Sequence, residues 1–297
     1  MQNMLIRLGL LILFSTMLDG CASVQPQTSQ PQLHHSQDRV STSGLAYDLV
    51  GDGQLLVFIH GSNLDHRLWS EQLKYFQNSA SVLAYDLRGL GKSASATTAY
   101  SDHSDLKRLI EELGFERASL IGLSAGVQVA LDFALNYPAM VNRLVLVSPS
   151  INGFNPSQSP AYLPELIAAL RASDYETADE VLIASALMDT PSEYQALVRA
   201  MITDSGQWRL PYHLMQASSL GVLDNFQNVT HATLILLGGD DLPAITELGA
   251  MLSQRLANAH IETLASGNHL LNLSQPKSFH DALDRFFNFQ PNTSFQK

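Results

Sequence analysis

Five short runs of apolar residues recur along the chain, and their pattern predicts strands of a β-sheet. Each run is apolar at consecutive positions, so both faces of the strand are apolar, which is typical of buried parallel strands. The runs occupy residues 54–61, 81–89, 117–126, 141–149 and 231–239. We therefore expect an α/β fold with a mostly parallel central sheet that is flanked by helices.

Amphipathic stretches separate these runs and predict the flanking helices. In residues 104–114, apolar side chains recur at helical spacing, at Leu106, Leu109, Ile110 and Leu113. Gly114 follows where a helix commonly ends. Similar patterns occupy residues 68–78, 125–138 and 276–289. The alternation predicts right-handed crossovers and an active site at the carboxyl ends of the strands.

One long region breaks this alternation. Residues 152–225 contain no run typical of a strand, but they contain helical patterns at residues 163–173, 175–188 and 192–203. We expect this region to form a helical cap that is inserted into the α/β core. The core then comprises residues 44–151 and 226–297.

The first residues have the features of an export signal. Arg7 precedes an apolar run that is too short to span a bilayer and is typical of a signal-peptide core. Residues 18–21, Leu-Asp-Gly-Cys, resemble a bacterial lipobox, although Asp19 departs from the small or apolar residue usual there. The resemblance implies a lipoprotein signal peptide over residues 1–20 and acylation of Cys21, which anchors a protein stably to a membrane. A general secretory signal with an incidental cysteine is the alternative.

The residues that follow Cys21 extend this interpretation. Residues 22–43 are rich in Gln, Ser and Pro, so we expect residues 21–43 to form a disordered tether. Ala22 and Ser23 follow the cysteine in place of Asp, and the lipoprotein sorting pattern then favours the outer membrane, with the protein facing the periplasm. Cys21 is the only cysteine in the chain, which excludes an intramolecular disulfide.

Composition and charge limit the classes of partner. Hydrophobic residues make up 45% of the chain, which is enough for a large core. The net charge of −11 argues against a nucleic-acid partner, because a phosphate-binding surface needs an excess of Lys and Arg. Residues 89–93, Gly-Leu-Gly-Lys-Ser, lack the glycine spacing of an ATP-binding phosphate loop. No metal and no organic cofactor is predicted, and the oligomeric state is left open.

Ser124 stands between an apolar run and a helical pattern, with a glycine two residues away on each side. In a tight turn between strand and helix its backbone is strained, and the two elements approach closely. Gly122 and Gly126 remove the Cβ atoms that would clash there. The turn exposes the Ser124 hydroxyl beside a helix N-terminus, which favours negative charge. The pattern G-x-S-x-G is that of a nucleophile elbow.

A serine nucleophile needs a base and an acid that orients the base, and these follow in the order acid, then histidine. Asp240 and Asp241 come at the end of a predicted strand, and His269 lies near the C-terminus. Taken singly, the aspartates have an ordinary explanation as turn residues and the histidine as a surface loop residue. Because they occur together in the required order, we predict a Ser-His-Asp triad with Ser124 and His269.

Five motifs in order resemble those of the α/β-hydrolase superfamily, in particular its capped serine-hydrolase branch of esterases and C–C bond hydrolases. They are the His-Gly strand end at 60–61, the Asp-x-Arg-Gly-x-Gly-x-Ser segment at 86–93, the elbow at 122–126, the Gly-x-x-Asp turn at 238–241 and the loop around His269. The resemblance covers residues 44–289 and selects Asp241 over Asp240. Asn268 stands where the family often has glycine, and we expect it to tolerate an unusual backbone conformation.

The resemblance implies a role for each matching residue. Ser124 attacks an acyl carbonyl, and His269 accepts its proton and returns it to the leaving group. Asp241 holds the imidazole in its productive tautomer. The backbone N–H groups of Ser62 and Ala125 form the oxyanion hole.

These roles predict a carboxylic ester hydrolase that cleaves small to medium acyl substrates through an acyl-enzyme. Lactone, amide and C–C bond cleavage stay open. Ser124 excludes haloalkane dehalogenases and epoxide hydrolases, which resemble this chain but carry Asp at the elbow. Residues 60–65 lack the glycine-rich turn of a dinucleotide-binding dehydrogenase. The alternative is a ligand-binding, receptor-like protein that keeps the triad and has little or no turnover. His60, Asp86 and Arg88 are expected to fix the loops around the site.

Overall fold

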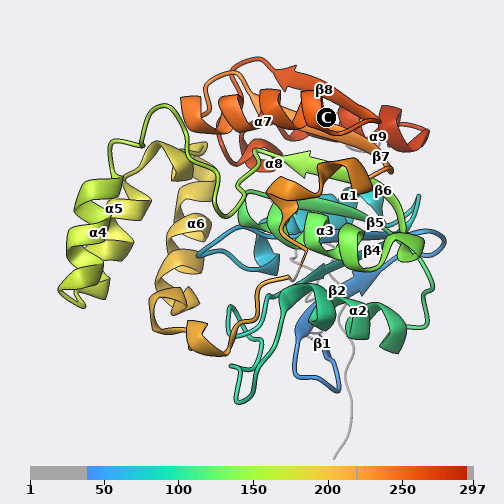
Figure 1. Cartoon of the computed structure of the whole chain (residues 1–297). Helices are drawn as coiled ribbons and strands as arrows, with labels where there is room; N and C mark the ends of the chain where they lie inside the picture. Colours follow the sequence, from blue (N-terminus) through green and yellow to red (C-terminus); the bar gives the residue numbers. More distant parts are fainter. Residues whose placement is uncertain (1–38, 219, 293–297) are drawn as a thin grey trace, which may run out of the picture. The chain divides into compact units, whose positions relative to one another are not determined.

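The computed structural model describes residues 39–218 and 220–292, which belong to one compact unit. An eight-stranded sheet lies at its centre, in the order β1-β2-β4-β3-β5-β6-β7-β8 (Figure 1). β2 pairs antiparallel with β1 and β4, and every other pair is parallel. The strands are β1 (Arg39–Val40), β2 (Ala46–Val50), β3 (Leu55–Ile59), β4 (Ser81–Tyr85), β5 (Ala118–Leu123), β6 (Val141–Val147), β7 (Ala232–Gly238) and β8 (Ala259–Leu264). The predicted fold class is confirmed.

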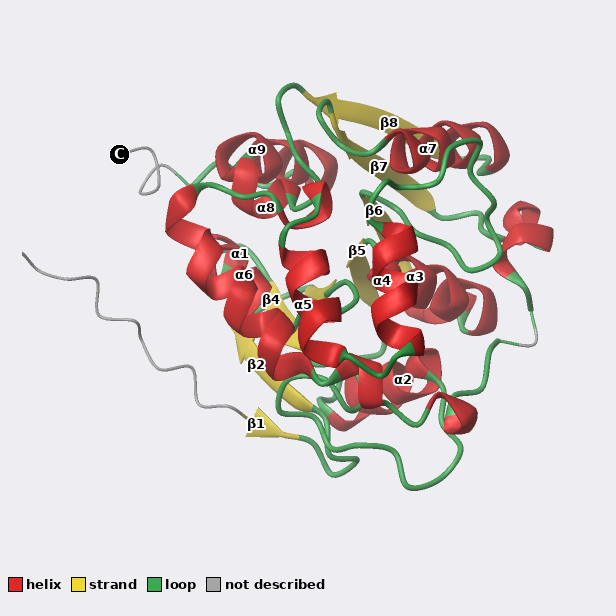
Figure 2. Cartoon of the chain, turned by 90° about the vertical axis from the view of Figure 1, so that its left-hand side faces the viewer, coloured by secondary structure: helices red, strands yellow, loops and turns green. Residues whose placement is uncertain are grey.

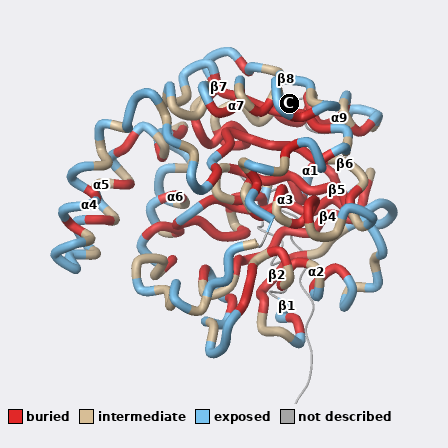
Figure 3. Tube along the Cα trace, in the orientation of Figure 1, coloured by how far each residue is buried: buried red, intermediate tan, exposed pale blue. Residues whose placement is uncertain are grey.

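Strand β3 shows why continuous apolar runs form the central strands. Leu55, Val57 and Ile59 belong to a core on one face of the sheet. Leu56 and Phe58 belong to a second core on the other face. Because successive side chains of a strand point to opposite faces, a strand covered on both sides needs apolar residues at every position. Figure 3 shows this buried interior as the red part of the trace.

Helices cover both faces of the sheet. The first core receives side chains from α2 (Asp102–Glu112), α3 (Ala125–Asn136) and α7 (Pro243–Arg255). The second core receives side chains from α1 (Ser70–Phe76), α8 (Leu271–Ser274) and α9 (Pro276–Phe287). Two buried layers of helix and sheet therefore hold the strand ends in place.

A helical insertion separates β6 from β7, as predicted. It contains α4 (Leu163–Arg171), α5 (Tyr175–Ile183) and α6 (Ser192–Ser205), followed by short 3-10 helices. The three helices face the viewer in Figure 2, in front of the sheet. Buried side chains of α4 and α5 pack on each other, and α6 adds Val198, Met201 and Ile202 to the second core. We call this insertion the cap.

The N-terminal boundary differs from the expected one. The tether was predicted to extend through residue 43, but Arg39 and Val40 form β1, opposite Tyr47 and Ala46 of β2. The predicted signal peptide, Cys21 and the rest of the tether lie outside the described residues. Within residues 39–218 and 220–292, no helix combines the length and the apolar character that crossing a membrane requires.

His280, on α9, is a buried histidine whose titration affects stability. Gln72 Nε2 lies 3.1 Å from His280 Nε2, so the amide donates to an unprotonated ring nitrogen. Burial lowers the pKa of His280 to about 4, from an ordinary value of 6.5. The unfolded chain takes up this proton at a higher pH than the folded chain does. Acidification through that window therefore lowers the free energy of unfolding.

We expect this histidine to contribute a loss of about 2 kcal/mol between pH 7 and pH 5. Urea unfolding of the wild type and of His280→Gln at both pH values checks the effect, because glutamine does not titrate. The wild type should lose more stability than the variant over this range. Equal losses in the two proteins would contradict the assignment.

Candidate active site

Ser124 occupies the sharp turn between β5 and α3. β5 ends at Leu123 and α3 begins at Ala125, so one residue makes the turn. Its backbone has φ 53° and ψ −118°, a conformation that a residue with a side chain rarely adopts. The Ser124 N–H donates to Val147 O at the end of β6 (2.9 Å). The strained turn predicted for the elbow is confirmed.

The flanking glycines permit this turn, as the sequence predicted. A Cβ at Gly122 would lie 2.4 Å from Gly126 O, and a Cβ at Gly126 would lie 2.4 Å from Ile59 O. Both distances are far below a van der Waals contact, and both partners are backbone atoms that cannot rotate away. Strand β5, helix α3 and strand β3 therefore approach so closely that only glycine fits at these two positions.

Replacing Gly126 by alanine is expected to lower the free energy of unfolding by about 3 kcal/mol, because α3 must move away from β3. The matched control is Gly221→Ala, where the added Cβ meets only Asp224 Oδ2 at 3.6 Å. That control should change stability by less than about 1 kcal/mol. Urea unfolding of both variants provides the comparison. Similar losses of unfolding free energy in the two variants would show that α3 does not approach β3 closely.

The two predicted oxyanion donors lie on segments that adjoin Ser124 or pack on its turn. Ala125 is the first residue of α3, and the first N–H groups of a helix have no partner within the helix. Ser62 lies on the loop after β3, and it lines the same cavity as Ser124. A Cβ at Gly61 would lie 3.1 Å from the Ser124 Cβ, so this loop packs directly on the elbow.

Two loops that lie far apart in the sequence present the acid and the histidine. A Cβ at Gly238 would lie 2.1 Å from Gly267 O, so the end of β7 passes directly against the histidine loop. The Asp240 N–H donates to the same carbonyl oxygen (3.0 Å). Asp241 follows β7, and His269 lies on the histidine loop. The His269 Nδ1 atom is 3.1 Å from both carboxylate oxygens of Asp241. The structure therefore brings Asp241 and His269 together.

Asp241, rather than Asp240, faces the imidazole. Its side chain is fully buried, whereas Asp240 is exposed. Burial alone raises the pKa of the Asp241 carboxyl, but the contact with His269 and further hydrogen bonds to the carboxylate together outweigh burial and lower it. The Leu242 N–H also donates to Asp241 Oδ1 (2.7 Å). The carboxylate is therefore ionised at neutral pH beside the imidazole.

A cavity of about 240 Å³ lies beside Ser124 and His269. Ser124 and His269 line it together with Ser62, Asn63 and Ser150 from the core. The cap contributes mostly apolar side chains, namely Tyr162, Leu166, Leu182, Leu187, Met188 and Trp208. A bound molecule therefore meets polar groups on the core side and an apolar wall on the cap side.

Ser124 and His269 share this cavity but are not hydrogen-bonded to each other. Among the described residues, the His269 ring nitrogen that bonds a side chain is Nδ1, and its partner is Asp241. Hydrogen bonds between a nucleophile and its base are often long before substrate binds and tighten in the reacting complex. The structure therefore shows the contact of His269 with Asp241 and a cavity that His269 shares with Ser124.

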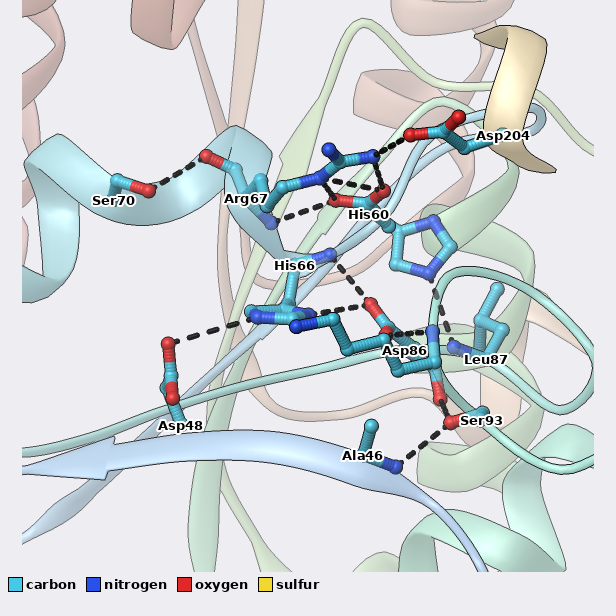
Figure 4. Close-up of polar contacts among 12 residues, drawn as sticks. Ala46, Asp48, His60, His66, Arg67, Ser70, Asp86, Leu87, Ser93 and Asp204 are labelled. Carbon is cyan, nitrogen blue, oxygen red and sulfur yellow. Dashed lines mark hydrogen bonds and ion pairs between the residues drawn. The ribbon is translucent and has the colours of Figure 1, made fainter. Parts of the chain in front are cut away.

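Three buried or half-buried polar residues, His60, Asp86 and Arg88, hold the loops behind the site, as predicted. Figure 4 shows the first two. His60 Nε2 accepts from the Leu87 N–H (3.0 Å), so Nδ1 carries the proton and donates to Gly61 O (2.8 Å). Burial lowers the pKa of His60, which keeps the ring neutral. The ring thereby ties the end of β3 to the end of β4. Arg88 Nε donates to Asp105 of α2 (2.5 Å).

Asp86 lies at the centre of a buried polar cluster (Figure 4). Its Oδ1 accepts from the backbone N–H and from Nδ1 of His66, both at 2.7 Å, and its Oδ2 accepts from the Lys92 N–H (2.8 Å). Burial opposes charge on both side chains, but their contact outweighs it. The pKa of Asp86 is therefore lowered and that of His66 is raised.

The same cluster brings groups of metal-ligand type together. Ligand atoms of Asp65, His66 and Asp86 lie within 4.8 Å of one another. The Asp86 oxygens already accept hydrogen bonds, and Asp65 Oδ2 binds Arg67 Nη2 at 2.6 Å. We therefore interpret this cluster as a hydrogen-bond network that fixes the loops.

The sequence did not indicate which residues connect the cap to the loops that carry Asn63 and His269. Asn268 was expected to tolerate an unusual backbone conformation, but the loop does not require one of it, because the left-handed residue there is Ser266 (φ 55°). The Asn268 side chain instead donates to Asp189 Oδ2 in the cap (2.9 Å). The Asn63 N–H donates to Gln207 Oε1, also in the cap. The local sequence pattern around these residues predicts neither contact.

Comparison with known proteins places this geometry in a family. Residues 56–282 match the model of the alpha/beta hydrolase family. Epoxide hydrolase 4 of Mus musculus is 26% identical over 277 residues, covering 82% of this chain and 76% of that protein. 3-Oxoadipate enol-lactonase 2 of Acinetobacter baylyi is 21% identical over 262 residues, covering 84% of this chain and 96% of that protein.

A solved structure shares the fold. The esterase EaEST of Exiguobacterium antarcticum superposes with a TM-score of 0.70 at 19% identity, covering 82% of this chain and 95% of that chain. At this identity the likeness shows the fold alone. The family match, however, spans most of the sequence and includes the elbow, the acid turn and the histidine loop. The chain belongs to the alpha/beta hydrolase family.

Proposed function

We propose that the protein is a serine hydrolase that cleaves small to medium carboxylic esters through an acyl-enzyme. One observation carries the proposal: His269 Nδ1 lies 3.1 Å from both oxygens of a buried Asp241, in a cavity that His269 shares with Ser124. A serine on a strained turn, an oriented histidine and a buried carboxylate are the groups that nucleophilic acyl transfer requires.

In this mechanism Ser124 Oγ forms a bond to the carbonyl carbon while His269 Nε2 takes the hydroxyl proton. Asp241 accepts from Nδ1–H, which leaves Nε2 free to act as the base, and it stabilises the imidazolium that forms. The carbonyl oxygen becomes an oxyanion that accepts from the N–H groups of Ser62 and Ala125. Each such donor contributes about 3 kcal/mol in the transition state.

The ester bond then breaks, and His269 gives its proton to the departing alcohol. A water molecule enters, loses its proton to His269 and attacks the acyl carbon. Collapse of this second intermediate releases the carboxylic acid and returns the proton to Ser124.

The cavity supports an apolar acyl or alkoxy group of limited size. Its volume is about 240 Å³, and the cap side is mostly apolar. Each methylene buried against such a wall contributes about 0.8 kcal/mol. We therefore expect kcat/KM to rise with acyl chain length until the cavity is filled, and then to fall.

Labelling with a fluorophosphonate, beside a panel of p-nitrophenyl esters from acetate to palmitate, tests the proposal. The expected result is an adduct on the peptide that carries Ser124, with turnover highest for short or medium chains. A folded protein that is neither labelled nor active on any ester would overturn the proposal in favour of a ligand-binding role.

For the location, we propose that Cys21 is acylated and anchors the enzyme to the outer membrane, facing the periplasm. The lipobox-like residues 18–21 and the Gln-, Ser- and Pro-rich residues 22–43 support this assignment. Incorporation of labelled palmitate should occur in the wild type and be lost in Cys21→Ser. Equal incorporation in both proteins would refute acylation at Cys21.

A further inference from the structure

The cap reaches the loop of the proposed oxyanion hole through one glutamine. We call residues 61–63 the oxyanion loop. Asn63 has a left-handed backbone (φ 59°) and is buried, and its N–H donates to Gln207 Oε1. Gln207 begins the 3-10 helix η4 (Gln207–Arg209), which follows α6. Asn63 and Gln207 both line the cavity that contains Ser124.

Neighbouring residues fix Gln207 within the cap. Trp208 Nε1 donates to Asp179 Oδ1 on α5 (2.6 Å). The Arg209 guanidinium lies 4.6 Å from the centre of the Tyr175 ring, also on α5. These contacts orient η4 on the cap itself. The position of the Gln207 amide is therefore set by where the cap lies on the core.

The oxyanion loop is held in different ways at its two ends. At its start, Gly61 O accepts from His60 Nδ1 (2.8 Å), and Gly61 packs on the elbow. At its other end, the buried Nδ2 of Asn63 has no hydrogen-bond partner among the described residues. The Asn63 side-chain amide nitrogen therefore does not hold this end, and the backbone bond to Gln207 does.

We propose that Gln207 is a positioning residue that completes the oxyanion hole when the cap lies on the core; this inference rests on the proposed function. Because a peptide group is planar, fixing the Asn63 N–H also fixes the Ser62 carbonyl and restricts the orientation of the adjoining Ser62 N–H. Successive N–H groups around a left-handed residue form an anion-binding concavity. Gln207 holds one of them so that the other is directed at the reacting oxygen.

The expected cost of losing this contact falls on the chemical step. A misplacement of about 1 Å near a reacting group costs up to about 100-fold in rate. The oxyanion is absent from the bound substrate and forms only as the tetrahedral intermediate develops, so the substrate binds about as well as before. Removal of the Gln207 acceptor should therefore lower kcat by about 10- to 100-fold and leave KM within about twofold.

Two variants and a control test the role of Gln207. Gln207→Met keeps the size of the side chain without its acceptor, and Gln207→Asn keeps an amide that is too short to reach. Gln195→Met is the matched control, because the Gln195 amide donates to Thr190 O within the cap (3.3 Å). The readouts are kcat, KM, and inhibition by a trifluoromethyl ketone and by the carboxylic acid product.

The ketone forms an adduct with Ser124 whose oxygen occupies the oxyanion hole, whereas the product does not require a completed hole. In both Gln207 variants, ketone affinity should fall by the same factor as kcat/KM, and product affinity should stay unchanged. A defect of folding alone does not change the ratio of the two inhibition constants. Gln195→Met should behave as the wild type.

The results distinguish this inference from the proposed function. Wild-type protein that neither reacts with fluorophosphonate nor cleaves esters overturns the proposed function. Active wild type, with Gln207 variants that keep kcat and ketone affinity, overturns the role of Gln207 alone. Variants that raise KM and weaken product binding at unchanged kcat would assign Gln207 to substrate binding instead, and they also overturn the proposal.

Discussion

Replacing Ser124 by alanine is expected to lower kcat for ester substrates by about 10⁴-fold or more while the protein stays folded. Alanine cannot form the acyl-enzyme, and the rate that remains comes from the oxyanion hole and substrate binding alone. The measurement is initial-rate hydrolysis of the best p-nitrophenyl ester, with circular dichroism and thermal unfolding as tests of the fold.

The matched control for this substitution is Ser119→Ala. Ser119 lies on β5, the strand that leads into the turn at Ser124, near the opposite end of that strand. The substitution removes a serine hydroxyl there as well. Its kcat should stay within about twofold of the wild type. A Ser124→Ala protein that keeps more than about a tenth of the wild-type kcat would assign the nucleophile to another residue.

Replacing Asp241 by asparagine is expected to lower kcat by about 10⁴-fold with little change in structure. The asparagine amide can donate to His269 Nδ1, which places the ring proton on Nε2. In this tautomer the imidazole cannot take the proton of Ser124, although every group keeps its place. The measurement is kcat as a function of pH for the variant and the wild type.

Asp240→Asn provides a control that makes the same chemical change one residue earlier in the chain. Asp240 is exposed, whereas the Asp241 carboxylate contacts the His269 ring. Asp240→Asn should therefore keep nearly wild-type kcat. Similar losses in the two variants would mean that the local charge of the turn matters and that the His269–Asp241 contact does not.

The central strands were predictable because burial on both faces requires a continuous apolar run in the sequence. Each of the five apolar runs contains one strand of the parallel part of the sheet, from β3 to β7. The outer strands β1 and β8 have no such apolar run. β8 is partly exposed along most of its length, and its sequence mixes polar and apolar residues. β1 has only two residues, and both are exposed. Their place in the sheet follows from pairing with neighbours.

Part of the candidate site was predictable for a similar reason. Gly122, Gly126 and Gly238 stand where backbone atoms of another segment come within 2.4 Å of a Cβ position. Because such steric demands allow only one residue type at a position, the local sequence alone is enough to recognise them. The approach of Asp241 to His269 was inferred from chain order and resemblance, and the structure supplies its geometry.

The contacts of the cap were not predictable in this way. Gln207 begins a short 3-10 helix, and Asn268 lies in a loop. Both are ordinary polar residues, and each bonds a partner more than seventy positions away. No periodicity or spacing relates such partners, because the relative placement of cap and core decides which polar groups meet. The same placement decides the lining of the cavity, and thereby the choice of substrate.

The central claim is that Ser124, His269 and Asp241 act as one catalytic unit, and a mutant cycle of kcat/KM tests it most directly. Ser124→Ala, His269→Ala and the double variant are compared on one ester, with all three shown to be folded. Groups that act on the same proton transfer are strongly non-additive. We expect the double variant to be about as slow as either single variant. A double variant whose loss equals the product of the two single losses would show that the serine and the histidine act independently, and it would contradict the triad.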